Sequence, residues 1–207
     1  MSPTWSHPIW DAYQSQGNLN CLREDVLTTP WYRLPATVDD SLLVRAVECC
    51  DVGAAKVLME LGETPSLPTD DGFTIIHTAV DVAHEKKESQ DSLQLIESLL
   101  EFGADPNVQG ADGTPLHRAV GWGLTDVAEL LLRHGANIEV RTLIDGELTP
   151  LMYAAMMGQP ESVRCLLKHG ADTRARCAAY CDNLTVEELV ENQNAESAEL
   201  ILAILRG

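Results

Sequence analysis

The chain has 207 residues, of which 45% are apolar and 22% charged, a balance typical of a globular domain or a short array of repeats. This composition excludes a disordered or collagen-like chain. With 14 Lys and Arg against 32 Asp and Glu, the net charge is −18, which repels phosphate backbones and anionic lipid. We therefore expect no nucleic-acid partner and no membrane, and we favour a protein partner with a basic surface.

The first 39 residues differ in composition from the rest of the chain. They hold five of the ten aromatic side chains and four of the ten prolines, which is not the composition of a free tail. Residues 8–13 favour a short helix, and Pro30 and Pro35 favour an extended stretch over residues 29–35. We predict that residues 1–39 form an irregular, aromatic-rich cap that docks on the following residues. Whether it covers their binding face stays open.

From residue 40 onward the sequence repeats. A Thr or Ser opens each unit, and a Gly preceded by apolar residues follows 21 residues later. These pairs are Ser41 and Gly62, Thr114 and Gly135, and Thr149 and Gly170. Thr74 reaches Gly103 only after 29 residues, which places about eight extra residues in the polar stretch 81–92. A last unit starts at Thr185. The repeat domain is thus residues 40–207, with predicted units at about 40–70, 71–110, 111–142, 143–177 and 178–207.

Each unit predicts two helices. Thr114 can cap the free amides of a helix, and Pro115 suits the first helical position because it has no amide hydrogen to leave unpaired. Gly135 is suited to end the second helix in a left-handed conformation. Asp-Gly pairs such as Asp112–Gly113 favour tight turns between units. A helix pair cannot bury its own apolar face, so the units must stack.

The chain resembles the ankyrin-repeat family, whose signature combines Thr-Pro-Leu-His-x-Ala with Gly-Ala-Asp-x-Asn. Residues 114–119 read TPLHRA, and residues 103–107 read GADPN. The resemblance covers about four fifths of the chain. It implies an all-α solenoid of about five helix-turn-helix units with hairpin fingers.

The resemblance also implies a protein-binding face, built by the fingers and the exposed side of each first helix. In the family the partner-facing positions lie one residue before the Thr and four, seven and eight residues after it. The predicted contact residues are Phe73, Asp81, Arg118, Trp122, Leu148, Tyr153, Met156 and Met157. Aromatic and Met side chains at such exposed positions favour an interaction patch.

Catalytic and metal-binding signatures are missing from the sequence. His77 and His117 are the signature histidines, and His134 and His169 each precede a helix-ending Gly, where a helix carboxyl end favours them. No zinc-type spacing, phosphate loop or nucleophile motif occurs, so we predict no cofactor, no metal and no enzyme. The alternative is an enzyme or small-molecule binder. Its pocket would lie between the N-terminal segment and the binding face, lined by Trp10, Trp31, Trp122 and Tyr153, with His7 or His84 as acid or base.

The expected location is the cytoplasm. No basic start followed by an apolar stretch opens the chain, and no apolar run approaches the roughly 18 residues of a spanning helix. The six cysteines lack a Cys-x-x-Cys pair and are expected to be reduced. The predicted function is that of a non-catalytic binding module, monomeric on its own, acting as an inhibitor or immunity protein, a chaperone or an adaptor.

Overall fold

A computed structural model describes residues 7–29, 41–66, 73–143, 146–178, 182–192 and 197–206. These residues contain twelve α-helices and no strand, only isolated antiparallel bridges such as Gly110–Gly113. The helices are α1 Pro8–Gln16, α2 Leu19–Thr28, α3 Leu42–Glu48, α4 Val52–Glu60, α5 Ile75–Glu85, α6 Gln90–Glu101, α7 Pro115–Gly121, α8 Thr125–Arg133, α9 Pro150–Met156, α10 Pro160–Lys168, α11 Val186–Glu191 and α12 Ala198–Arg206.

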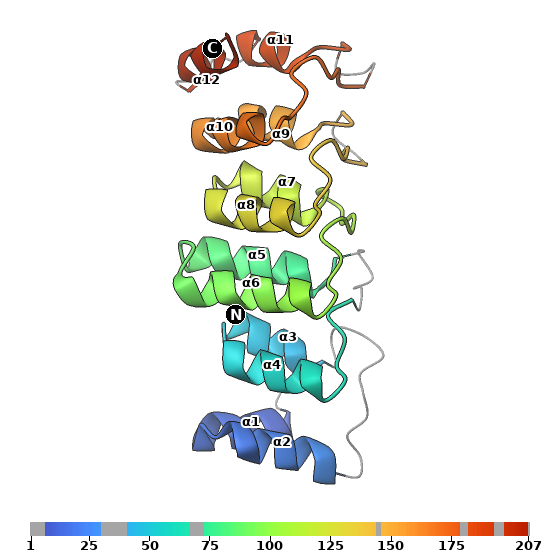
Figure 1. Cartoon of the computed structure of the whole chain (residues 1–207), viewed down its shortest axis with the longest axis vertical. Helices are drawn as coiled ribbons and strands as arrows, with labels where there is room; N and C mark the ends of the chain where they lie inside the picture. The colour runs from blue at the N-terminus through green and yellow to red at the C-terminus, as the bar shows by residue number, and fades with distance from the viewer. Residues whose placement is uncertain are drawn as a thin grey trace.

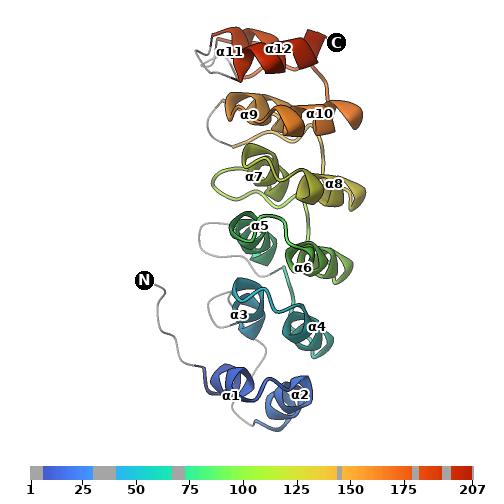
Figure 2. The ribbon, with the colours of Figure 1, turned by 90° about the vertical axis from the view of Figure 1, so that its left-hand side faces the viewer.

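Consecutive helices form pairs, and the pairs stack in a single column (Figure 1). The first helices contact one another in the order α3, α5, α7, α9 and α11, and the second helices in the order α2, α4, α6, α8, α10 and α12 (Figure 2). One apolar core runs between the two rows, and Ala46, Ala79, Ala119 and Ala154 are fully buried in it at the same place of four units. The predicted all-α ankyrin solenoid is confirmed.

The first helices begin as the sequence predicts. Thr114 is the N-cap residue of α7, and the N–H of Thr114 donates back to Nδ1 of His117 at 3.2 Å. Thr74 and His77 make the same pair at the start of α5. In the last unit Glu188 takes the place of the histidine and receives the N–H of Thr185 at 2.7 Å. The signature Thr and His therefore satisfy amide groups that a helix start leaves unpaired.

Within residues 7–29, the described part of the N-terminal segment, the chain forms two helices, which corrects the prediction of an irregular segment. The helices α1 and α2 form a further pair at the end of the column, where α2 packs against α4 (Figure 2). Pro8 starts α1, and Ile9, Trp10 and Tyr13 are buried. The Tyr13 hydroxyl donates to Asp51 at 2.7 Å. The apolar residues on one face of each short helix thus allow it to pack as part of the stack. The predicted extended stretch over residues 29–35 lies, apart from residue 29, outside the described residues.

The extra residues of the second unit lengthen its helices. The helices α5 and α6 have 11 and 12 residues, against 7 and 9 in α7 and α8. Both project beyond the neighbouring pairs in Figure 1. Residues 86–89 form the turn that joins them, and His84 lies in the last turn of α5. None of the helices in the described residues is long and apolar enough to cross a membrane.

Candidate functional site

The inner face is the surface that the first helices α3, α5, α7, α9 and α11 turn away from the second helices (Figure 2). Seven of the eight predicted contact residues have side chains that are half-buried or exposed there. Leu148 is the exception, because its side chain is 1% exposed. The N–H of Leu148 bonds to Thr142 Oγ1, and its carbonyl receives the Thr142 N–H, each at 3.0 Å. The assignment of Leu148 as a contact residue was therefore wrong, since it is a core residue.

Arg118 is the centre of the charged half of this face. Its guanidinium donates to both carboxylate oxygens of Asp81 at 2.8 and 3.0 Å and to Asp112 at 2.8 Å. Its Cζ lies 4.6 Å from the ring centroid of Phe73 and 5.7 Å from that of Trp122, within the range of cation–π attraction. The Arg118 side chain is only 12% exposed. Arg118 is thus a nearly buried residue that holds its neighbours in place. The exposed charges here are the carboxylates of Asp81 and Asp112.

The carboxylates around Arg118 leave a net negative charge on this part of the face. Burial raises the pKa of Asp81, while the ion pair with Arg118 acts in the opposite direction. Asp112 was not among the predicted contacts, although it belongs to the Asp-Gly turn of its unit. Its pairing with Arg118 is what places it here. One cation facing two carboxylates favours a cationic group on a partner.

The apolar half of the face lies on units three and four. Trp122, Met156 and Met157 are 39%, 36% and 47% exposed, which is unusual for such large apolar side chains in a well-packed stack. Tyr153 is half-buried, and its ring lies edge-on to that of His117, with centroids 5.8 Å apart. Trp122 follows α7 directly, while Tyr153 and Met156 lie on α9, which contacts α7. The structure therefore brings these four residues onto neighbouring units.

A cleft opens between these side chains. It has a volume of about 90 Å³ and is lined by Asp112, Arg118, Gly121, Trp122, Tyr153 and Met157. Gly121 allows the close approach of Tyr153, because a Cβ on Gly121 would lie 2.5 Å from a ring carbon of Tyr153. The cleft joins the charged half to the apolar half of the face.

The signature histidines lie behind the face, in the core. His117 is fully buried, and its Nε2 donates to the carbonyl of Leu148 at 3.0 Å. Burial lowers the pKa of His77 and of His117 to about 4, and the charge of Arg118 adds to this effect at His77. Both rings are therefore neutral at physiological pH. The bond from His117 to Leu148 ties the start of α7 to the next unit, and Nδ1 of His77 accepts the N–H of Thr74 within its own unit, so both rings have a structural role.

The alternative pocket with the N-terminal segment is not formed by the described residues. Trp10 is buried against Tyr13 in the first helix pair, with ring centroids 5.3 Å apart. Two helix pairs, α3–α4 and α5–α6, separate it from Trp122 in the column (Figure 1). His7 lies at the start of α1 and His84 near the end of α5, in different units. Trp31 lies outside the described residues.

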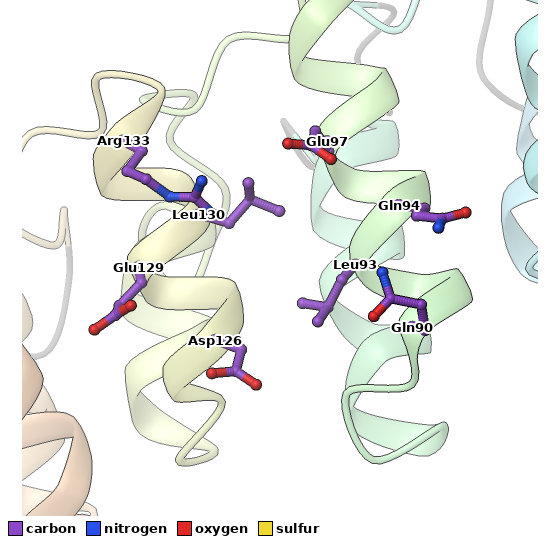
Figure 3. A pocket seen from close by; sticks show the side chains of 8 residues that line it. All are labelled: Gln90, Leu93, Gln94, Glu97, Asp126, Glu129, Leu130 and Arg133. Atoms are coloured by element: carbon purple, nitrogen blue, oxygen red, sulfur yellow. The ribbon is translucent and has the colours of Figure 1, made fainter.

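A second hollow, which the sequence did not reveal, lies on the opposite side of the stack. It has a volume of about 240 Å³ and separates α6 from α8 (Figure 3). Residues at positions i, i+3, i+4 and i+7 of each helix line it. These are Gln90, Leu93, Gln94 and Glu97 on α6, and Asp126, Glu129, Leu130 and Arg133 on α8. Glu129 is paired with Lys168 of α10 at 3.1 Å. Helical periodicity in α6 and α8 would have found these stripes, but not the gap between them.

Metal and thiol chemistry have little support in the described part of the chain. No group of three or more His, Cys, Asp or Glu is placed there to hold a metal ion. Cys21, Cys49, Cys50 and Cys165 are free thiols. Cys177 is buried and accepts the Leu184 N–H at 3.3 Å. Burial raises the pKa of Cys165 to about 11, which makes this thiol a poor nucleophile.

Comparison with known proteins agrees with this architecture. Residues 86–177 match the model of ankyrin repeats in three copies. Together with the stacked helix pairs, this match shows that the chain belongs to the ankyrin-repeat family.

Three similar proteins illustrate how widely the repeats are shared. A 2-5A-dependent ribonuclease of Homo sapiens is 41% identical over 75 residues, 35% of this chain and 10% of that protein. Ankyrin repeat and SOCS box protein 16 of Mus musculus is 39% identical over 80 residues, 38% of this chain and 18% of that protein. The ADP-ribosylation factor GTPase-activating protein AGD4 of Arabidopsis thaliana is 38% identical over 162 residues, 72% of this chain and 19% of that protein. The chain thus spans less than a fifth of each of these three relatives, and the similarity concerns the repeats.

Proposed function

We propose that the chain is a non-catalytic, cytoplasmic binding module that recognises another protein through the inner face of units three and four. Ankyrin repeats are in general protein–protein interaction modules. One observation carries the proposal further. Of the eight large apolar side chains that are exposed in the described residues, Trp122, Met156 and Met157 lie on two neighbouring units of this face. An exposed apolar patch with aromatic members is the usual composition of a binding hot spot.

The charge of the molecule supports a basic partner. The net charge is −18, and Asp81 and Asp112 stand beside the apolar patch around the nearly buried Arg118. An acidic surface speeds encounter with a basic protein and repels acidic ones. A module that binds as a monomer by surface complementarity can serve as an inhibitor, an immunity protein or an adaptor, three roles that share this contact.

The decisive experiment is affinity capture from a lysate of cells that express the chain. The bait is compared with the double variant Trp122→Ala plus Tyr153→Ala. We expect the variant to lose a specific partner, with binding weakened at least about thirtyfold, since each anchor contributes on the order of 1–2 kcal/mol. The matched control is Phe102→Ala plus Leu200→Ala. Phe102 follows α6 and is 42% exposed, and Leu200 lies on α12 and is 46% exposed, so this variant removes exposed apolar side chains elsewhere. Recovery of the same proteins by all three baits would overturn the proposal.

Salt dependence tests the electrostatic half separately. Raising the ionic strength should slow association with the captured partner, while dissociation changes little. A rate of association that is independent of salt would contradict the basic-partner proposal and leave the apolar patch standing.

A further inference from the structure

The long helix pair of unit two contacts the turn that carries Trp122. His84, in the last turn of α5, stacks on the ring of Trp122, with centroids 4.6 Å apart and an interplanar angle of 28°. The first helices of units three and four, α7 and α9, are shorter and end before the position that corresponds to His84. The extra length of α5 is therefore what brings an aromatic ring to Trp122.

The turn between α5 and α6 makes a second contact with the same region. Oε1 of Glu88 accepts the N–H of Val127 at 3.1 Å, at the start of α8. The N-cap residue of α8, Leu124, has no side chain that could cap the helix, so a carboxylate from the neighbouring unit serves instead. Two contacts thus fix the segment from Trp122 to Val127, one on each side of Leu124.

The turn adopts a costly backbone to reach this position. Lys87 and Glu88 have φ values of 54° and 52°, in the left-handed region that residues other than Gly disfavour. Such a conformation persists only where the surroundings hold it in place. The Glu88 bond to α8 and the Lys87 N–H bond to the carbonyl of His84, at 3.2 Å, supply that support.

Trp122 consequently forms a fixed wall of the cleft. Arg118 contacts its ring as well, with Cζ 5.7 Å from the centroid. Tyr153 also lines the cleft, and it lies against Gly121 and His117. A side chain that is ordered before binding loses little rotamer freedom when the partner arrives, which favours binding.

The cleft also indicates what enters it. Its volume of about 90 Å³ is smaller than the roughly 150 Å³ of a cavity that holds benzene, so it matches one branched aliphatic side chain. Trp122, Tyr153 and Met157 give it apolar walls, and the carboxylate of Asp112 stands at its edge. Asp112 is exposed, with one of its oxygens bonded to Arg118.

We infer that residues 84–89 act as a brace that holds Trp122 in place, and that the braced cleft takes one aliphatic side chain of a partner with a Lys or Arg next to it. The identity of this occupant rests on the proposed function, whereas the brace does not. His84 and Glu88 are positioning residues, since they act on the cleft through Trp122 and α8.

The brace is tested on the isolated protein by ¹⁵N relaxation of the Trp122 indole N–H, assigned through Trp122→Phe. The wild-type indole should have an order parameter near that of a rigid backbone, about 0.85, and His84→Ala plus Glu88→Ala, which removes both the ring and the acceptor, should lower it below about 0.6. The single variant His84→Phe, with Glu88 unchanged, keeps a ring on Trp122, and its indole should be as rigid as in the wild type. Glu85→Gln removes a neighbouring exposed carboxylate and should change nothing. An indole equally rigid in the double variant would overturn the brace.

The occupant is tested with three defined probes, the acetylated dipeptide amides Ac-Leu-Lys-NH2, Ac-Ala-Lys-NH2 and Ac-Leu-Glu-NH2. Ac-Leu-Lys-NH2 should shift the Trp122 indole and the Met157 methyl resonance with a dissociation constant in the millimolar range. The other two should bind at least about tenfold more weakly, because one lacks most of the aliphatic group and the other reverses the charge. Equal shifts with all three probes would overturn the inferred occupant. Failure of the capture experiment together with selective probe binding would reject the proposed partner surface and leave the cleft intact.

Discussion

The first helices have two sides that follow different rules. On the buried side, Thr114 and His117 repeat the arrangement of Thr74 and His77, with the same 3.2 Å hydrogen bond. On the inner face, the residues four positions after those Thr residues are Arg118 and Thr78, which share neither size nor charge.

This difference shows where structure and recognition are encoded. The buried side must pair every amide group and fill the core, so few residue types fit it. The inner face carries no such constraint, and its side chains are free to match a partner. Substitutions on the buried side should therefore alter stability, and substitutions on the inner face should alter affinity for a partner.

The largest expected effect is acid destabilisation through the buried histidines. In both rings Nδ1 accepts a backbone N–H, so the neutral form is the one that fits. The folded pKa is about 4 against 6.5 in the unfolded chain, so the unfolded state binds more protons between these values. Stability from this source is complete above pH 6.5 and is lost as the pH falls towards 4. At pH 5 the loss is about 2 kcal/mol for each histidine.

Urea unfolding at pH 7.5 and pH 5 measures this loss. The variant His117→Met places in unit three the residue that unit four has at the same position, the buried Met152. It should be less stable at pH 7.5, because the Leu148 carbonyl loses its donor, but its decrease between the two pH values should be about 2 kcal/mol smaller than in the wild type. An identical decrease in both proteins would show that His117 does not titrate as the structure indicates.

The next effect concerns Arg118, which belongs to both sides. Arg118→Met keeps the aliphatic stem but leaves Asp81 and Asp112 without their shared cation, and we expect a loss of about 1–2 kcal/mol. Because the charge of Arg118 helps to lower the pKa of His77, this pKa should rise in the variant. Chemical unfolding and NMR titration of His77 measure the two effects. Arg164→Met, which removes an exposed ion pair with Glu161, is the control and should be near neutral.

Much of this division could be predicted from sequence. The helix starts at Thr74, Thr114 and Thr149 depend on neighbours within three residues, and the period of the repeat exposed the stacking. The family offsets also selected Arg118 and Trp122, whose side chains are half-buried and exposed.

The failures have one physical cause, which is that depth and long-range pairing are set by the units on either side. The offset rule gives a direction, yet the side chain of Leu148 lies in the apolar core, and Thr142 bonds both of its backbone groups. The pair Arg118–Asp81 joins residues 37 positions apart. The role of the turn at Glu88 depends on its hydrogen bond with the N–H of Val127 in the next unit. The short α1 and α2 pattern became interpretable only once α4 offered a surface for it.

Gly121 marks the border between the two sides, and a substitution there should have a smaller effect. A Cβ on this residue would lie 2.5 Å from Tyr153, so Gly121→Ala must push the ring out of the cleft. Overpacking costs about 2 kcal/mol, and the better helix propensity of Ala returns about 1 kcal/mol, which leaves a net loss of about 1 kcal/mol. In a Tyr153→Ala background the same substitution should be neutral or stabilising. An equal cost in both backgrounds would refute the contact.

The smallest effect on stability is expected at the two exposed methionines. Met156 and Met157 are 36% and 47% exposed, so replacing both by Ser removes apolar surface that is largely in water already. The free energy of unfolding should change by no more than about 0.5 kcal/mol, whereas Met152→Ser on the same helix should cost on the order of 3 kcal/mol, because Met152 is 1% exposed. Affinity for the captured partner should reverse this order, falling in the Met156→Ser plus Met157→Ser variant and remaining unchanged in folded Met152→Ser. A stability loss from the exposed pair comparable to that of Met152→Ser would mean that the inner face is part of the core, and the distinction between the two sides of the first helices would fail.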